Sequence, residues 1–175
     1  MKTIVIYKSR TGFTKRYAQW IAEELACEVI AYDDIPDINF DHVDVIIYGG
    51  RVHAGKIDDL GKIKKLFVNN ESKLIVFATG ATPIEAAEEI EKIMRCNFDD
   101  TSIPHFYMQS GLCYEKMGLV DKTIMTALSK MLSNKNNKSD AEKGTAMAIS
   151  KSYDISDRTF IQPLIQCVKE LQSNS

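Results

Sequence analysis

The chain has 175 residues, of which 45% are hydrophobic and 26% are charged. These values are ordinary for a globular protein, and the length allows a substantial core without disulfides or a structural metal. The formal net charge of -2, from 22 basic and 24 acidic residues, excludes a general electrostatic attraction to nucleic acid. We therefore predict one domain over residues 1–175 and no nucleic-acid partner.

The N-terminus and the cysteines restrict the cellular setting. The first apolar segment, residues 3–7, is too short for the core of a signal peptide or for a membrane-spanning helix, so we expect a cytoplasmic protein. Cys27, Cys96, Cys113 and Cys167 lie far apart without paired spacing. That spacing is not typical of a zinc site or a redox dithiol, and we predict ordinary thiols and no metal.

Apolar runs alternate with amphipathic stretches along the chain. The predicted strands cover residues 3–7, 28–32, 43–48, 74–78 and 105–109. The predicted helices cover residues 14–26, 60–68, 84–94, 119–132 and 157–171, and the polar run 133–140 is predicted to be an exposed loop. The third strand is expected to end at Gly49 and Gly50, and Pro83 to stand in the first turn of the third helix.

Five strands separated by helices predict a doubly wound α/β fold, a three-layer sandwich with a five-stranded parallel sheet and helices on both faces. In such folds ligands bind outside the carboxyl ends of the strands, where the winding direction reverses. The loops after the first, third and fourth strands are therefore the candidate site.

The first of these loops joins a buried strand to the start of a helix. It consists of Ser9, Arg10, Thr11, Gly12, Phe13 and Thr14. A phosphate monoester needs several donors, and three hydroxyls together with the N–H groups of a helix start supply them. Gly12 lets the backbone turn close to an anion. Helix capping alone is the alternative, but three hydroxyls exceed what a cap needs.

The pattern Ser9-x-Thr11-Gly12-x-Thr14 after an N-terminal strand resembles the FMN phosphate loop of flavodoxins. The resemblance implies that FMN is the cofactor. The loop lacks the Gly-x-Gly-x-x-Gly pattern of dinucleotide-binding folds and the Walker pattern of nucleotide-binding ones. The resemblance also implies flavin contacts from the second and third loops, through Gly50, Arg51, Val52, His53, Ala54, Thr79, Gly80 and Ala81.

Several of these residues have a second interpretation. Many flavodoxins stack an aromatic residue on the flavin from the second loop, whereas this chain has Val52 and His53 there. Contact of His53 with the ring and exposure of His53 to solvent are both open, and Arg51 fits a solvated position as well. Residues 79–82 also fit an ordinary strand-to-helix turn ending at Pro83.

Over nearly its full length the chain resembles the subfamily that includes menaquinone-dependent protoporphyrinogen IX dehydrogenase. The resemblance rests on the phosphate loop, on residues 49–55 and on Gly111-Leu112-Cys113-Tyr114 followed by a helix containing Met and Leu. It implies a quinone or porphyrinogen substrate. The acidic segment 82–91 departs from this subfamily, which carries a more basic segment there; we interpret it as a solvated face.

Three hypotheses follow. The chain is an electron carrier or FMN-dependent oxidoreductase with a redox partner protein, a porphyrinogen dehydrogenase, or a non-redox module that binds another phosphate ligand or a protein. Within the segment 120–132, the residues Ile124, Met125, Leu128, Met131 and Leu132 are predicted to pack in the core. Peripheral membrane contact through this helix is the less favoured alternative, because only Lys122 and Lys130 support it.

Overall fold

The computed structural model describes residues 1–37, 40, 43–67, 74–98, 102–134 and 151–173. It divides into two compact units, one of Met1–Ser110 with Ser156–Ser175 and one of Gly111–Ile155. The single domain over residues 1–175 stays a prediction.

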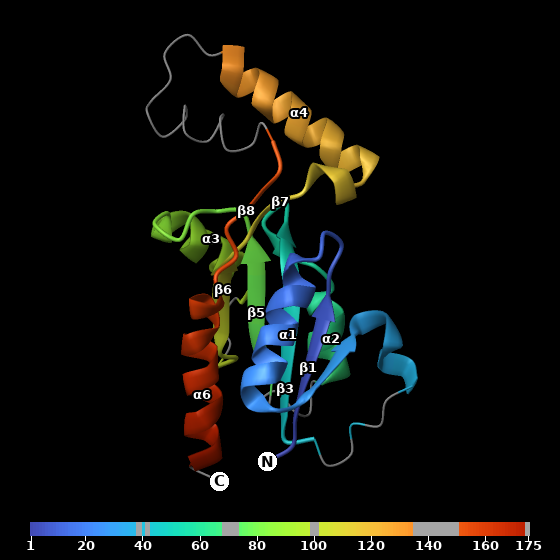
Figure 1. Cartoon of the computed structure of the whole chain (residues 1–175), viewed down its shortest axis with the longest axis vertical. Coiled ribbons are helices and arrows are strands. Elements are labelled where there is room, and N and C mark those ends of the chain that lie inside the picture. Colours follow the sequence, from blue (N-terminus) through green and yellow to red (C-terminus); the bar gives the residue numbers. More distant parts are fainter. Residues whose placement is uncertain (38–39, 41–42, 68–73, 99–101, 135–150, 174–175) are drawn as a thin grey trace. The chain divides into compact units, whose positions relative to one another are not determined.

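The first unit is built on a parallel sheet (Figure 1). Its strands are β1 (Thr3–Lys8), β2 (Glu28–Ala31), β3 (Val45–His53), β5 (Leu74–Gly80) and β6 (His105–Gln109), in the order β2-β1-β3-β5-β6. A short strand β4 (Lys56–Ile57) pairs antiparallel with β3. This is the predicted doubly wound α/β fold, which is thereby confirmed. The winding direction reverses between β1 and β3, where a ligand crevice is expected.

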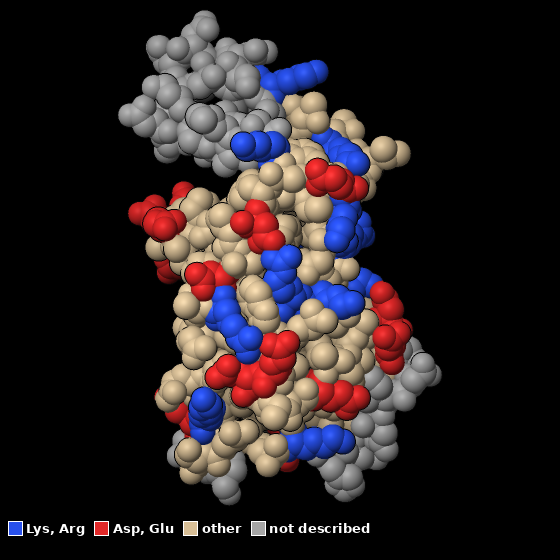
Figure 2. Space-filling model, viewed as in Figure 1, with Lys and Arg blue, Asp and Glu red and all other residues tan. Residues whose placement is uncertain are grey.

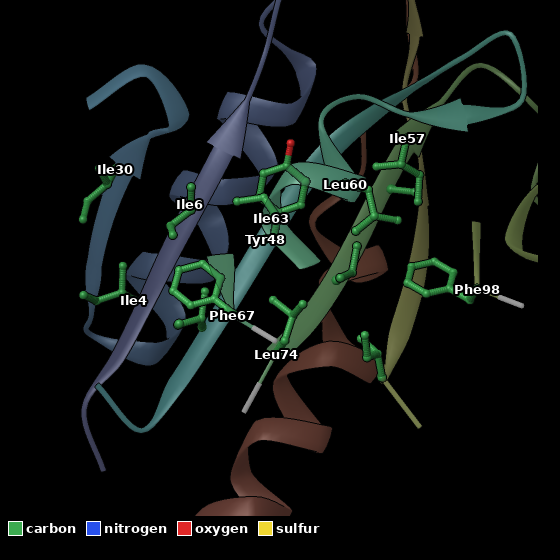
Figure 3. Close-up of a cluster of buried hydrophobic side chains, with 14 of the residues drawn as sticks. Ile4, Ile6, Ile30, Tyr48, Ile57, Leu60, Ile63, Phe67, Leu74 and Phe98 are labelled. Atoms are coloured by element: carbon green, nitrogen blue, oxygen red, sulfur yellow. The ribbon is translucent and has the colours of Figure 1, made fainter. Parts of the chain in front are cut away.

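Helices cover both faces of this sheet. They are α1 (Phe13–Leu25), α2 (Leu60–Leu66), α3 (Ala87–Asn97) and α6 (Gln162–Ser173), with 3-10 turns η1 (Tyr32–Asp37) and η4 (Arg158–Ile161). One buried cluster joins α2 and α3 to one face through residues such as Ile6 and Tyr48 (Figure 3). The other joins α1 and α6 to the opposite face through residues such as Val5 and Ile47. Both faces are buried, which explains the near-continuous apolar runs of the central strands.

The predicted end of the third strand is wrong, because β3 continues through Gly49 and Gly50 to His53. Gly49 lies between Tyr7 of β1 and Phe77 of β5, and a Cβ at Gly49 would stand 2.0 Å from Cζ of Phe77. The glycine therefore makes room for an aromatic ring inside the sheet and does not end the strand.

The third predicted helix begins later than expected, at Ala87 and not at residue 84. The carbonyl of Thr82 accepts a hydrogen bond from the Tyr107 hydroxyl, and the N–H of Ile84 donates to Oε1 of Gln109. These backbone groups are thus bound by side chains of β6, and Pro83 lies before the helix. The last helix is likewise divided: the Asp157 carboxylate accepts from Thr159 N–H and caps η4, and α6 follows.

The second unit contains a two-stranded antiparallel ladder of β7 (Gly111–Leu112) and β8 (Tyr153–Asp154), the 3-10 turn η3 (Tyr114–Lys116) and α4 (Leu119–Asn134). The ladder was not predicted from the sequence. Ile124 is 55% exposed, so the prediction that it packs in the core is wrong, and the preceding Val120 is 71% exposed as well. Only short elements accompany α4 in the described part of this unit and offer it little surface for burial. Residues 135–140 of the predicted loop lie outside the described residues, and 133–134 belong to α4.

Two further features of the described ranges concern the cysteines and the helices. All four cysteines are free. None of the helices within those ranges is both long and apolar enough to span a bilayer.

Candidate functional site

The start of α1 has the features of an anion site. Gly12, with φ 100°, takes the left-handed conformation directly before the helix, and its N–H donates to Oγ of Ser9 at 3.2 Å. No side chain caps this helix start, and its first turn contains no acidic residue. Lys15 and Arg16 lie there instead, and basic side chains gather over this end of α1 in Figure 2. Free N–H groups and the positive end of the helix dipole favour an anion at this place.

The remaining residues of this loop differ in exposure. Arg10 is exposed and Thr11 is half-buried. Phe13 is buried, with the Arg16 guanidinium 6.0 Å from its ring centroid. Phe13 therefore anchors the helix start, while Thr11 and the backbone of Gly12 remain partly accessible.

Thr14 contacts the third loop directly. Its hydroxyl lies 2.8 Å from the hydroxyl of Thr79 at the end of β5, and both side chains are buried. In such a pair one hydroxyl donates to the other, and the acceptor keeps its own hydrogen for a further partner. Both residues were candidates from the sequence, but their contact was not predicted, because the two positions are 65 residues apart.

The second loop is a β-hairpin. At its base the Nε of Arg51 pairs with Oδ2 of Asp58 at 2.7 Å, and the Tyr48 hydroxyl donates to the carbonyl of Asp58 at 2.5 Å. Burial is the main reason that the pKa of Tyr48 is raised, so this hydroxyl stays protonated. Arg51 is largely buried in this ion pair, so the solvated position is wrong, and its contact with the cofactor stays a prediction.

The hairpin turn consists of Ala54 and Gly55, with φ values of 48° and 78°. Two successive positive φ values are characteristic of the type I′ turns that join antiparallel strands. His53 and Ala54 are exposed at the tip, Val52 is half-buried and Gly50 is buried at the base. A Cβ at Gly50 would stand 2.6 Å from Cγ2 of Ile57, so the glycine allows the returning strand to pack closely.

The third loop is held by β6 and the residue after it. The carbonyl of Gly80 accepts from both the N–H and the Oγ of Ser110, at 2.8 and 3.1 Å. Tyr107 and Gln109 bind the next residues of the loop, at 2.9 and 3.0 Å. Sequence reasoning named Thr79, Gly80 and Ala81 here but missed the three β6-side residues, whose side chains give no local signal of this role.

The three loops meet at one edge of the sheet. Lys8 pairs with Gly50 between β1 and β3, and Arg51 pairs with Thr79 between β3 and β5. The structure thus brings the three loops named from the sequence together. Across the ranges that the structure describes, no group of His, Cys, Asp and Glu is arranged to hold a metal ion.

This arrangement agrees with a comparison against protein families, in which residues 4–139 match the model of the flavodoxin domain. The chain belongs to the flavodoxin-domain family. Among curated proteins no match was found. Members of the family bind FMN and transfer electrons, and this chain is an FMN-binding flavodoxin-domain protein with an electron-transfer role.

Several solved structures of flavodoxins match this chain. Flavodoxin 2 from Bacillus cereus is 17% identical, with 86% of this chain and 98% of that chain covered and a TM-score of 0.43. A WrbA-like flavodoxin from Agrobacterium tumefaciens is 18% identical, with 69% and 87% covered and a TM-score of 0.42. A flavodoxin from the domain Archaea is 25% identical, with 53% and 75% covered and a TM-score of 0.38.

The residues present fit FMN. Its phosphate is an anion, and the start of α1 combines a left-handed glycine, uncapped N–H groups and basic neighbours. The pair Thr14 and Thr79 retains one hydroxyl hydrogen at the same edge. No carboxylate stands in the first turn of α1 to repel the phosphate.

Proposed function

We propose that residues 9–14 bind the FMN phosphate, and that the β3–β4 hairpin and the β5–α3 loop flank the flavin ring. The observation that carries the proposal is the start of α1, which lacks a cap and an acid but carries Lys15 and Arg16. Cations are unfavourable at a helix N-terminus unless an anion binds there. The contact of Thr14 with Thr79 supports a common site for phosphate and ring, because it joins the first loop to the third.

When bound, the flavin supplies the redox chemistry, and the protein sets its exposure and hydrogen bonding. The chain's own residues then have two tasks. The loop after β1 binds and orients the phosphate, while Val52, His53 and Ala54 from the hairpin and Gly80 and Ala81 from the third loop shape the ring environment. We propose no general acid or base among them.

A finer assignment is oxidation of a porphyrinogen with a quinone as acceptor. It is supported by the sequence resemblance and by the apolar residues that α4 exposes, Leu119, Val120 and Ile124, since both substrates are apolar. The acidic residues of α3 argue against it, because the resembling enzymes are more basic at this place. We therefore place this reaction second to general FMN-dependent electron transfer with a redox partner protein. Turnover of protoporphyrinogen IX with menaquinone tests it directly.

FMN uptake by the full chain tests the proposed site. Quenching of flavin fluorescence gives the Kd for the unsubstituted protein and for Gly12→Val and Thr14→Val. We expect both variants to bind FMN at least tenfold more weakly, because the first cannot easily adopt the left-handed turn and the second removes a hydroxyl at the helix start.

Thr3→Val is the matched control for Thr14→Val. The Thr3 side chain is also buried and lies at the start of β1, the strand that leads into this loop, but its hydroxyl has no hydrogen-bond partner among the described residues. Its removal is expected to leave FMN affinity unchanged and the stability equal or higher. Unchanged affinity in both loop variants contradicts the phosphate site, and a chain that takes up no FMN favours the non-redox alternative.

A further inference from the structure

We propose that Asn97 is a positioning residue for the flavin ring, because its side chain fastens the β3–β4 hairpin to the last turn of α3. This inference rests on the proposed function, in which the hairpin flanks the ring. Asn97 lies outside all three predicted loops and was not identified by the sequence analysis.

The contacts of Asn97 are concentrated on one short strand. Its Oδ1 accepts from the N–H of Ile57 at 2.9 Å, and its Nδ2 donates to the carbonyl of Gly55 at 2.9 Å. These two backbone groups flank Lys56 on the edge of β4 that does not face β3. A side-chain amide thus takes the place that a further strand would occupy.

The chemistry of this position requires an asparagine. The second hydrogen of Nδ2 goes to the carbonyl of Ile93, one turn earlier in α3, at 2.7 Å. Both N–H donors and the oxygen acceptor of the amide are therefore used. A carboxylate of the same shape has no donor and would face the carbonyl oxygens of Gly55 and Ile93.

Neighbouring contacts support the same docking. Lys56 Nζ donates to the carbonyl of Cys96, and Lys64 Nζ donates to the carbonyl of Asn97 at 2.8 Å. Ile57 points into the buried cluster that also contains Phe98 (Figure 3). The returning strand β4 thus packs on the core through Ile57 and binds the end of α3 along its outer edge.

The exposed tip, His53 and Ala54, is joined to β4 by the pairing of His53 with Lys56 and by the two-residue turn. Its place relative to the ring therefore depends on β4, and β4 depends on Asn97. Loss of the amide contacts is expected to loosen the hairpin, which flanks the flavin ring in the proposed site. The phosphate-binding residues at the start of α1 should stay in place. Affinity for a flavin without phosphate should then fall as much as affinity for FMN.

The test compares the full chain with Asn97→Asp, using FMN, riboflavin and inorganic phosphate as separate probes. At pH 8 we expect the Kd values of FMN and riboflavin to rise by a similar factor of about ten, and the absorption bands of bound FMN to move toward those of free FMN. Phosphate, measured by competition with FMN, should bind within twofold of the unsubstituted chain. Gln172→Glu, an exposed position on α6, is the control for the same change in charge and should behave like the unsubstituted chain.

A pH series with riboflavin separates positioning from general damage. Carbonyl oxygens beside the introduced carboxyl favour its protonated form, and protonation returns one O–H donor. The riboflavin affinity of Asn97→Asp should therefore recover at least threefold between pH 8 and pH 5 relative to Gln172→Glu. Riboflavin is used because the FMN phosphate itself changes charge in this range.

The outcomes of this test distinguish the inference from the function on which it rests. Failure of the unsubstituted chain to bind FMN overturns the proposed function. If the unsubstituted chain binds FMN and Asn97→Asp has the same affinity and the same spectrum, the positioning role alone is overturned. An equal loss of affinity for riboflavin and for phosphate in Asn97→Asp overturns it as well. Should Asn97→Asp not fold, Lys56→Met, which keeps the apolar stem and removes the other tie to α3, is expected to weaken riboflavin binding two- to threefold. No change in that variant rejects the role.

Discussion

The β5–α3 loop and the β3–β4 hairpin leave neighbouring strands at the same edge of the sheet, but they are held in different ways. Three side chains from β6 and the residue after it, Tyr107, Gln109 and Ser110, bind the backbone of the loop. The hairpin is held on its outer edge by Asn97 from a helix. The loop therefore belongs to the sheet, whereas the hairpin depends on the placement of α3.

This difference bears on how each region responds to substitution. Several independent hydrogen bonds to one loop make the loss of any one tolerable, since the others keep the backbone in place. On the outer edge of the hairpin one amide makes both hydrogen bonds to the backbone, so its loss removes them together and leaves the contact of Lys56 with Cys96. We expect the loop to act as a rigid wall of the site and the hairpin as its adjustable wall.

The largest effect is expected where both regions share a base, at Gly49 of β3. Gly49→Ala would place a methyl group 2.0 Å from Cζ of Phe77 on β5. Overpacking typically costs about 1–3 kcal/mol and occasionally more; we expect this variant at the upper end of that range, and urea denaturation measures it. Gly61→Ala on α2, where nothing lies within 4 Å of the added carbon, is the control and should be neutral or stabilising by up to about 1 kcal/mol. Equal stability of the two variants would falsify the packing that joins the two regions.

The base of the hairpin provides the next test. Asp58→Asn replaces the carboxylate that pairs with Arg51, and both side chains are largely buried. A hydrogen bond between charged groups in such a place contributes about 2 kcal/mol, so the midpoint of urea unfolding should fall accordingly. Asp34→Asn, an exposed carboxylate on η1, should leave the midpoint unchanged. If Asp58→Asn is as stable as Asp34→Asn, the ion pair does not fix the hairpin.

Local patterns were sufficient to predict the sheet, and they also carry the prediction of the phosphate loop. The run of residues 3–7 is β-branched and apolar throughout, and residues 9–14 form one continuous motif. The error at Gly49 arose because a glycine pair is read locally as a strand end, whereas the reason for it is the ring of Phe77 on another strand. The roles of Asn97 and of the pairing between Thr14 and Thr79 depend on partners 40 or more residues away. Such roles have no periodicity and no local composition that could have revealed them.

A smaller effect is expected when one anchor of the loop is removed. Tyr107→Phe deletes the hydroxyl that donates to the carbonyl of Thr82 and should cost about 1 kcal/mol. FMN affinity should stay within twofold, because Gln109 and Ser110 still bind the loop. The double variant Tyr107→Phe with Gln109→Met should lower the affinity further. A loss in Tyr107→Phe alone as large as in Asn97→Asp would remove the distinction between rigid and adjustable walls.

The smallest effect is expected at Asp157, which touches neither region. Its carboxylate accepts from Thr159 N–H at 2.7 Å, and this hydrogen bond holds the pKa of Asp157 below its usual value. The unfolded chain therefore binds the proton more readily than the folded one, so the stabilisation is fully present above the unfolded pKa of about 3.9 and is lost as the pH falls through the lower folded pKa. Asp157→Asn keeps an acceptor but cannot titrate. Its melting temperature should consequently depend less on pH between 5 and 2 than that of the unsubstituted chain, while FMN affinity at pH 7 stays the same. If Asp157→Asn also lowered FMN affinity, the hydrogen bond at η4 would affect the FMN site. FMN affinity would then not depend mainly on the hairpin.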